Sequence, residues 1–219
     1  MRCAIIKAMR RVVTVQDIPA GGVFRVERGA LWTPSARDLA RERGVEIVEM
    51  DAEELAALAG PERTIAIGAD HGGFALKERL KPLLAELGWR VEDVGIYEEK
   101  PADYPDIAHA VALRVAEGRA ALGIVADGAG IGSAMAANKV PGVRAALCYD
   151  RASARNSREH NHANVLTLGG RMLTPSQAED VVRTWLATPC GGGRHAARAA
   201  KITEIERRYS SWTPQNWKK

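Results

Sequence analysis

Aromatic residues and cysteines are both scarce in this sequence. Phe, Trp and Tyr together make up 5% of the 219 residues, and no aromatic side chains are interleaved with the basic ones. Proteins that hold single-stranded nucleic acid usually stack its bases on such aromatics, so the sequence predicts no nucleic-acid partner. The cysteines Cys3, Cys148 and Cys190 are far apart and odd in number. This excludes a disulfide framework and a zinc knuckle, and it favours a reducing, cytoplasmic location.

Long apolar runs are absent as well. The longest candidate, Ala120 to Ala126, stops at Asp127, far short of the roughly 18 residues that a membrane helix needs. The N-terminus has Arg and Lys but no apolar stretch followed by a small-residue cleavage site. We therefore expect neither a membrane partner nor a signal peptide.

The basic residues that are present gather near one end. The net charge is +4, and residues 190–219 hold seven basic and two acidic residues. A basic excess confined to one segment suits a small anion.

From residue 64 onward, short apolar runs alternate with helical patterns. Strands are predicted at Thr64–Ala69, Arg90–Val94, Leu122–Ala126, Arg144–Cys148 and Val165–Leu168. The runs are mostly continuous, as in buried parallel strands. Helices are indicated after the first and second strands by apolar stripes that end at Gly88 and Gly118. A further helix is indicated after the fifth strand, where Thr174-Pro175 is a typical helix start. The pattern predicts an α/β fold, a five-stranded parallel sheet with helices on both faces in a Rossmann-like three-layer arrangement.

The first sixty residues follow another pattern. Short strands are expected at Val12–Val15, Gly22–Val26 and Val45–Val48, with a helix from Ser35 to Arg43, and Gly60-Pro61 marks a boundary. We expect a small α+β N-terminal extension over residues 1–62, a main domain over 63–209 and a C-terminal tail over 210–219.

Ligands of parallel sheets bind at the carboxyl ends of the strands, and a first polar motif lies at such an end. Gly68-Ala69-Asp70-His71-Gly72-Gly73 places an acid and an imidazole where they can approach a sugar. Alternatively, Asp70 caps the following helix and His71 is solvated.

A glycine-rich turn follows the third strand. In Asp127-Gly128-Ala129-Gly130-Ile131-Gly132-Ser133, backbone N–H groups can turn toward a phosphate or a developing oxyanion. The loop has neither a P-loop ending nor the full dinucleotide spacing, so ATP and NAD are disfavoured. The alternative is a tight turn without a ligand.

Two further motifs carry imidazole and guanidinium groups. His160-Asn161-His162 suits proton transfer beside hydroxyl recognition; no obvious metal ligand set is completed nearby, and a polar surface loop is the alternative. Arg194 and Arg198 share one helix face and suit a phosphate, and Arg171 could join them. The alternative is a solvated basic face. We expect no metal and no cofactor.

Taken in order, these motifs resemble the ribose-5-phosphate isomerase B family, which includes the galactose-6-phosphate isomerase subunits. The resemblance covers residues 64–209. It is carried by Ile67–Phe74, Asp103-Tyr104-Pro105, Gly128–Gly132 with Ala136–Lys139, Gly142–Ala145, Ser157–Asn161 and Gly191–His195.

The resemblance implies metal-free aldose–ketose isomerisation of a small-molecule sugar phosphate, most simply of ribose 5-phosphate in pentose phosphate metabolism. It also implies a homodimer, or a dimer of dimers, with the active site near the subunit interface. By this resemblance, Asp70 and His71 line the sugar site, and Tyr104 lies beside the substrate. The enediolate is stabilised by the loop residues Gly128, Ala129, Gly130, Ile131 and Gly132. His160 helps to open the sugar ring, Asn161 binds a hydroxyl, and the phosphate is held by Arg171, Arg194 and Arg198.

The sequence departs from the family at the base that moves the proton between C1 and C2. One branch has Cys immediately before the glycine loop and another has Glu just after it, where this chain has Asp127 and Ser133; Ala129 replaces the usual Thr or Ser. Asp127 can serve as the base, because a carboxylate is competent for this chemistry. Alternatively, Asp127 caps the turn, and the chain is a non-catalytic or reaction-shifted sugar-phosphate-binding protein.

The segment from Trp32 to Val45 looks similar to segments of enzymes linked to bacterial microcompartments. Residues 1–60 are therefore a candidate packaging or oligomerisation unit, with a shell or cargo protein as partner. A passive extension is the alternative.

Overall fold

The computed structural model describes residues 12–51 and 63–209. The chain divides into two compact units, Met1–Gly60 and Pro61–Lys219, each described here by itself.

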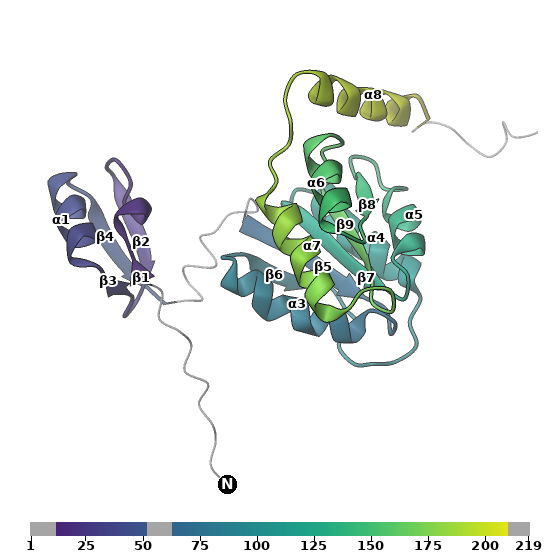
Figure 1. Cartoon of the computed structure of the whole chain (residues 1–219), viewed down its shortest axis with the longest axis horizontal. Helices are drawn as coiled ribbons and strands as arrows, with labels where there is room; N and C mark the ends of the chain where they lie inside the picture. Colours follow the sequence, from purple (N-terminus) through teal and green to yellow (C-terminus); the bar gives the residue numbers. More distant parts are fainter. Residues whose placement is uncertain (1–11, 52–62, 210–219) are drawn as a thin grey trace, which may run out of the picture. The chain divides into compact units, whose positions relative to one another are not determined.

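The larger unit is built on a five-stranded parallel sheet with strand order β6-β5-β7-β9-β8 (Figure 1). Its strands are β5 (Thr64–Ala69), β6 (Arg90–Asp93), β7 (Leu122–Asp127), β8 (Ala145–Leu147) and β9 (Val165–Gly169). All five predicted strands are confirmed to within a residue or two. Every residue of β5, β7 and β9 is buried, which explains their continuous apolar runs.

Helices cover both faces of this sheet, as predicted. They are α3 (Phe74–Glu86), α4 (Tyr104–Ala116), α5 (Ile131–Ala137), α6 (Arg151–Glu159) and α7 (Pro175–Ala187). On one face, α4 and α5 contribute Val111 and Ala137 to a core shared with Val125 of β7. On the other, α3, α6 and α7 pack around Leu80, Ala154 and Trp185.

The helix ends follow the sequence signals. Thr174 caps α7 by accepting the N–H of Gln177, with Pro175 as first helical residue. Gly88 and Gly118 have φ of +80° and +69° after α3 and α4, the left-handed conformation that ends a helix at low cost. The last helix, α8 (Arg194–Tyr209), contributes no described residue to the two cores of this unit.

The smaller unit contains two two-stranded parallel sheets, β1-β3 and β2-β4, and helix α1. The elements are β1 (Val12–Val13), a 3₁₀ turn η1 (Val15–Asp17), β2 (Val23–Glu27), β3 (Leu31–Trp32), α1 (Pro34–Glu42) and β4 (Glu46–Met50). Val13, Val26 and Ala40 belong to its core. The predicted strand over 12–15 ends at Val13, because Asp17 accepts the N–H and hydroxyl of Thr14 and closes the 3₁₀ turn.

Within the described residues, no helix has the length and apolarity required to cross a bilayer. The predicted boundary at residues 62 and 63 and the predicted tail over 210–219 fall at or outside the limits of the described residues.

Candidate active site

Three loops meet at the carboxyl edge of the sheet, because β5, β7 and β9 are neighbours in it. The N–H of Asp70 donates to the Ala126 carbonyl at 3.2 Å, and the N–H of Gly170 donates to the Asp127 carbonyl at 2.6 Å. The N–H of Arg171 donates to the Gly128 carbonyl at 3.0 Å. The loops that carry Asp70, the glycine turn and Arg171 are therefore bonded to one another through their backbones.

Glycine is required where these loops touch. A Cβ atom on Gly72 would lie 2.8 Å from the Gly128 nitrogen, and one on Gly170 would lie 2.5 Å from the Gly72 carbonyl oxygen. A Cβ on Gly73 would overlap the Ala126 carbonyl. The Asp70-His71-Gly72-Gly73 motif thus has a packing function in addition to any chemical one.

The carboxylate of Asp70 is buried and faces its own loop. Its Oδ1 accepts the N–H of Gly72 at 2.8 Å and that of Gly73 at 3.1 Å. This is the capping arrangement considered from the sequence. Oδ2 has further lone pairs for a substrate hydroxyl, so capping and substrate contact are compatible.

Asp127 is 5% exposed, and its carboxylate accepts three backbone N–H groups. Oδ1 accepts from Ala129 at 2.7 Å and from Gly130, whereas Oδ2 accepts from Ser133 at 3.1 Å. Two of the amides predicted to face an enediolate thus donate to Asp127 in this structure. Oδ2, with a single N–H donor, keeps a lone pair open.

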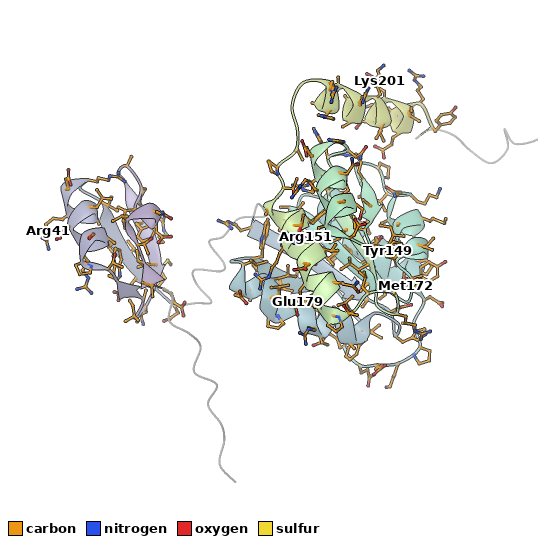
Figure 2. All side chains as sticks on the ribbon, in the orientation of Figure 1. Arg41, Tyr149, Arg151, Met172, Glu179 and Lys201 are labelled. Carbon is orange, nitrogen blue, oxygen red and sulfur yellow. The ribbon has the colours of Figure 1, made fainter. Side chains whose placement is uncertain are left out.

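Two predicted substrate-binding side chains contact the glycine loop. A Cβ on Gly132 would lie 2.5 Å from Cε2 of Tyr104, so the phenol packs directly on that glycine. Arg171 lies close to Gly128, with its Cδ 3.7 Å from a Cβ placed there. Tyr149, which follows β8 and is labelled in Figure 2, donates its hydroxyl to the Ala129 carbonyl at 2.9 Å.

A buried lysine supports the neighbouring loop and was not identified from the sequence. Lys77 is fully buried and donates to Asp93 Oδ2 at 2.7 Å and to the Ile96 carbonyl at 2.7 Å. Ile96 in turn donates its N–H to the Ala69 carbonyl, one residue before Asp70. Burial alone would raise the pKa of Asp93, but hydrogen bonds from Lys77 and Lys81 hold that pKa below its ordinary value.

A second group of predicted residues lies next to the amino end of β9. His160 is the C-cap of α6 and Asn161 follows it, whereas Arg194 and Arg198 belong to the first turns of α8. The imidazoles of His160 and His195 stack with centroids 4.1 Å apart and planes inclined by 7°. Desolvation, followed by the nearby His160 and Arg194, lowers the pKa of His195.

The start of α8 is fastened to the end of α6 by the backbone. Gly191 donates its N–H to the Glu159 carbonyl at 2.9 Å, and Nε2 of His162 lies 2.7 Å from the Gly191 carbonyl oxygen. A Cβ on Gly191 would come within 2.6 Å of the Glu159 carbonyl oxygen. The histidine-asparagine motif and the glycine-arginine motif therefore form one local cluster.

Within one chain, the predicted site residues thus form two groups. The carboxyl-edge group contains Asp70, His71, Tyr104, the loop Asp127–Gly132 and Arg171; the amino-edge group contains His160, Asn161, Arg194 and Arg198. Arg171, considered from the sequence as a partner of the other two arginines, lies in the carboxyl-edge group.

An open groove of about 650 Å³ runs between α6 and α7, beside the amino-edge group. Arg151, Arg155, Glu159, Arg183 and Gly191 are among its lining residues. Figure 2 labels Arg151. The groove includes neither Asp70 nor any residue of the Asp127–Gly132 loop, so it is distinct from the carboxyl-edge group.

Comparison with known proteins shows the family. Residues 65–202 match the family described as Ribose/Galactose Isomerase. Ribose-5-phosphate isomerase B of Escherichia coli is 43% identical over 67% of this chain and 98% of its own length. D-Erythrulose-4-phosphate isomerase of Pectobacterium atrosepticum is 38% identical over 65% of this chain and 95% of its own length.

Solved structures that resemble this chain belong to the same family. Ribose-5-phosphate isomerase B of Clostridium thermocellum is 48% identical and superposes with a TM-score of 0.66 over 67% of this chain and 99% of its own. Ribose-5-phosphate isomerase B of Mycoplasma genitalium, solved with bound ribulose 5-phosphate, is 39% identical. It superposes with a TM-score of 0.64 over 66% of this chain and 96% of its own. The chain belongs to the ribose/galactose isomerase family and is a sugar-phosphate isomerase, an aldose–ketose isomerase of the ribose-5-phosphate isomerase B type.

Proposed function

We propose that the protein interconverts ribose 5-phosphate and ribulose 5-phosphate through an enediol or enediolate. In the aldose-to-ketose direction, a base removes the proton from C2 and returns a proton to C1, while the O2 proton is lost and O1 gains one. The observation that carries this proposal is the meeting of Asp70, the Asp127–Gly132 loop and Arg171 at one sheet edge.

The proposed base is Asp127. Its carboxylate stands at the end of a buried strand, with Oδ2 bonded to a single N–H. The three N–H donors hold the carboxylate in one orientation, which favours catalysis by a fixed group. Tyr104 and His71 are proposed to line the sugar, with Asp70 bonding a hydroxyl.

The amino-edge group is proposed to complete the site of a second copy of the chain. In a homodimer, His160 and Asn161 of each subunit would face the other subunit's glycine loop, and Arg194 and Arg198 would join Arg171 on the phosphate. Two observations support this pairing. The two groups are separate within one chain, and α8 exposes Ile202 and Ile205 by 46% and 55%, an apolar surface suited to burial by a partner. A two-fold interface would form two equal sites. A dimer of dimers would preserve them.

One comparison supports erythrulose 4-phosphate as an alternative substrate. The relative from Pectobacterium atrosepticum is named for erythrulose 4-phosphate and is 38% identical, so a four-carbon phosphate is the main competitor. The non-catalytic alternative depends on the replacement of the family's Cys and Glu by Asp127 and Ser133.

The smaller unit is proposed to act in assembly. Residues 1–60 cluster separately from the isomerase unit, and the resemblance of residues 32–45 to microcompartment-linked enzymes suggests packaging with a shell or cargo protein in the cytoplasm. Removing residues 1–60 should then abolish co-purification with that partner while kcat is retained. Unchanged co-purification would refute the packaging role.

A substrate panel tests the proposed reaction. Wild type, Asp127→Asn and Asp127→Cys would each be assayed with ribose 5-phosphate, erythrulose 4-phosphate and galactose 6-phosphate. We expect wild type to prefer ribose 5-phosphate, and Asp127→Asn to lose at least ~10²-fold in kcat. Asp127→Cys, which supplies the base of one family branch, should retain part of the activity. Preference for another sugar would reassign the substrate, and full activity of Asp127→Asn would exclude Asp127 as the base.

A further inference from the structure

Three neighbouring side chains at the end of α6 form a chain of hydrogen bonds. Asn161 Nδ2 donates to the Oδ1 of Asn156 at 3.2 Å and to its carbonyl at 3.4 Å. Nδ2 of Asn156 lies 2.8 Å from Nδ1 of His160. Asn156 therefore stands between two residues proposed to contact substrate, and the proposed function gives it no role.

The direction of each bond follows from the one before it. An amide nitrogen can only donate and an amide oxygen can only accept. Because Asn161 donates to Oδ1 of Asn156, the nitrogen of Asn156 is the atom left to face His160. That nitrogen can only donate, so Nδ1 of His160 must accept and the neutral imidazole carries its proton on Nε2.

Packing fixes the plane of the same ring. His195 stacks on His160 with centroids 4.1 Å apart. The pKa of His195 is lowered by desolvation and by the nearby His160 and Arg194, which favours a neutral stacking partner. Oε1 of Glu159 lies 3.9 Å from Nε2 of His160, beyond hydrogen-bonding distance, so the Nε2–H is not taken up by that carboxylate.

We propose that Asn156 is a positioning residue that sets the hydrogen-bonding polarity of its two neighbours. It makes His160 a neutral donor through Nε2–H, and by engaging Nδ2 of Asn161 it leaves the Oδ1 of Asn161 as an acceptor for a hydroxyl. This inference rests on the proposed function for its substrate. In this arrangement His160 polarises a substrate oxygen, as a neutral imidazole does in some isomerases. His160 is therefore not the base that removes the proton from carbon.

The proposed dimer explains why so exposed a pair would hold its arrangement. Asn156 and Asn161 are both exposed in the single chain, where water competes for their bonds. A second subunit covering this end of α6 would exclude that water and strengthen the bonds.

The first experiment measures the tautomer of the His160 imidazole directly. Long-range ¹H–¹⁵N spectra of the full chain resolve which ring nitrogen of a histidine carries the proton. The chain has five histidines, and His160→Gln identifies the signal of interest. Wild type should show only the Nε2–H form at His160. Asn156→Asp replaces the donor by an acceptor and should shift His160 mainly to the Nδ1–H form, and Asn156→Leu should give both forms. Arg155→Ala, on the same helix, is the matched control and should leave the spectrum unchanged.

Activity provides the second measurement. Asn156→Asp should lower kcat about tenfold, the equivalent of one hydrogen bond of about 1.4 kcal/mol, with a smaller change in KM. Identical His160 spectra in wild type, Asn156→Asp and Asn156→Leu, or an Nδ1–H form in wild type, would overturn the inference. If Asn156→Asp fails to fold, the comparison of Asn156→Leu with wild type decides. If wild type converts no sugar phosphate, the proposed function fails while the spectra still decide the role of Asn156.

Discussion

The backbone N–H of Ser133 donates to Oδ2 of Asp127 at 3.1 Å, and this bond ties the first turn of α5 to the end of β7. Substituting Asp127→Asn keeps one acceptor oxygen but places an NH₂ group where Oδ2 stood. Donor then faces donor at Ser133. We expect the free energy of unfolding to fall by about 1–3 kcal/mol, measured by urea denaturation.

A capping aspartate elsewhere provides the control. Asp150 accepts the N–H of Ser153 at the start of α6, and because Asn caps a helix as well as Asp does, Asp150→Asn should leave the stability nearly unchanged. If Asp127→Asn and wild type have the same free energy of unfolding, the bond from Ser133 to Asp127 contributes nothing to stability.

The contact between Gly132 and Tyr104 predicts a clash. A Cβ at Gly132 would lie 2.5 Å from the Tyr104 ring, so Gly132→Ala must displace the phenol or the helix. We expect a loss of about 1–3 kcal/mol of stability and a raised KM, since Tyr104 is proposed to lie beside the sugar. Thermal unfolding and steady-state kinetics measure the two effects.

The same loop offers a matched control for this substitution. A Cβ at Gly128 would meet Arg171 Cδ at an ordinary 3.7 Å, so Gly128→Ala should change stability by about 0.5 kcal/mol or less. Truncating the ring in Gly132→Ala plus Tyr104→Ala should recover stability but not KM. Additive losses in the double variant would mean that the two residues do not interact.

How far the sequence predicts this molecule depends on how each element is buried. Strands such as Thr64–Ala69 were predictable because both of their faces are covered, which demands an unbroken apolar run. Helix α6 gave no signal, because only Ala154 and Ser157 of its nine residues are buried. The two-residue strand Leu31–Trp32 is too short for any periodicity.

The site was predictable to a similar degree. The rule that ligands bind at strand carboxyl ends located Asp70 and the glycine loop. It could not locate His160 or Arg194, which lie at the other end of β9 and are proposed to act on a second subunit. Lys77 was overlooked because a lysine within an apolar helix pattern is ordinarily solvated, and only the fold places Asp93 beside it.

Lys77 is expected to be a stability residue with an acid-dependent signature. Lys77→Met removes the ammonium group that bonds Asp93 at 2.7 Å and leaves Lys81 as that carboxylate's described cationic partner. We expect a loss of about 3 kcal/mol at neutral pH. In the exposed pair of Lys100 and Glu98, 70% and 67% accessible, the corresponding Lys100→Met should cost ~1 kcal/mol or less.

The pH dependence of this effect has a defined sign. The pKa of Asp93 is lowered in the folded state from its ordinary 3.8, so its contribution to stability is present above that value and is lost as the pH falls through the lower, folded value. Urea unfolding of wild type should therefore show stability declining in strong acid below about pH 4, and Lys77→Met should show a smaller decline. Parallel pH profiles for the two proteins would contradict the assignment.

A site shared between subunits makes a prediction that no single-chain site can meet. Under the proposed roles, Asp127→Asn should disable the carboxyl-edge group and Arg194→Ala plus Arg198→Ala should disable the amino-edge group. Each variant alone should then be nearly inactive. Mixed after reversible dissociation, they form hybrid dimers in which one site carries both sets of substitutions and the other carries none. Random pairing makes half of the dimers hybrids, so the mixture should recover about a quarter of the wild-type activity. Sedimentation would establish that dimers exchange. Exchange without recovered activity would place all the catalytic residues within one subunit, and the two groups of side chains would then have separate functions.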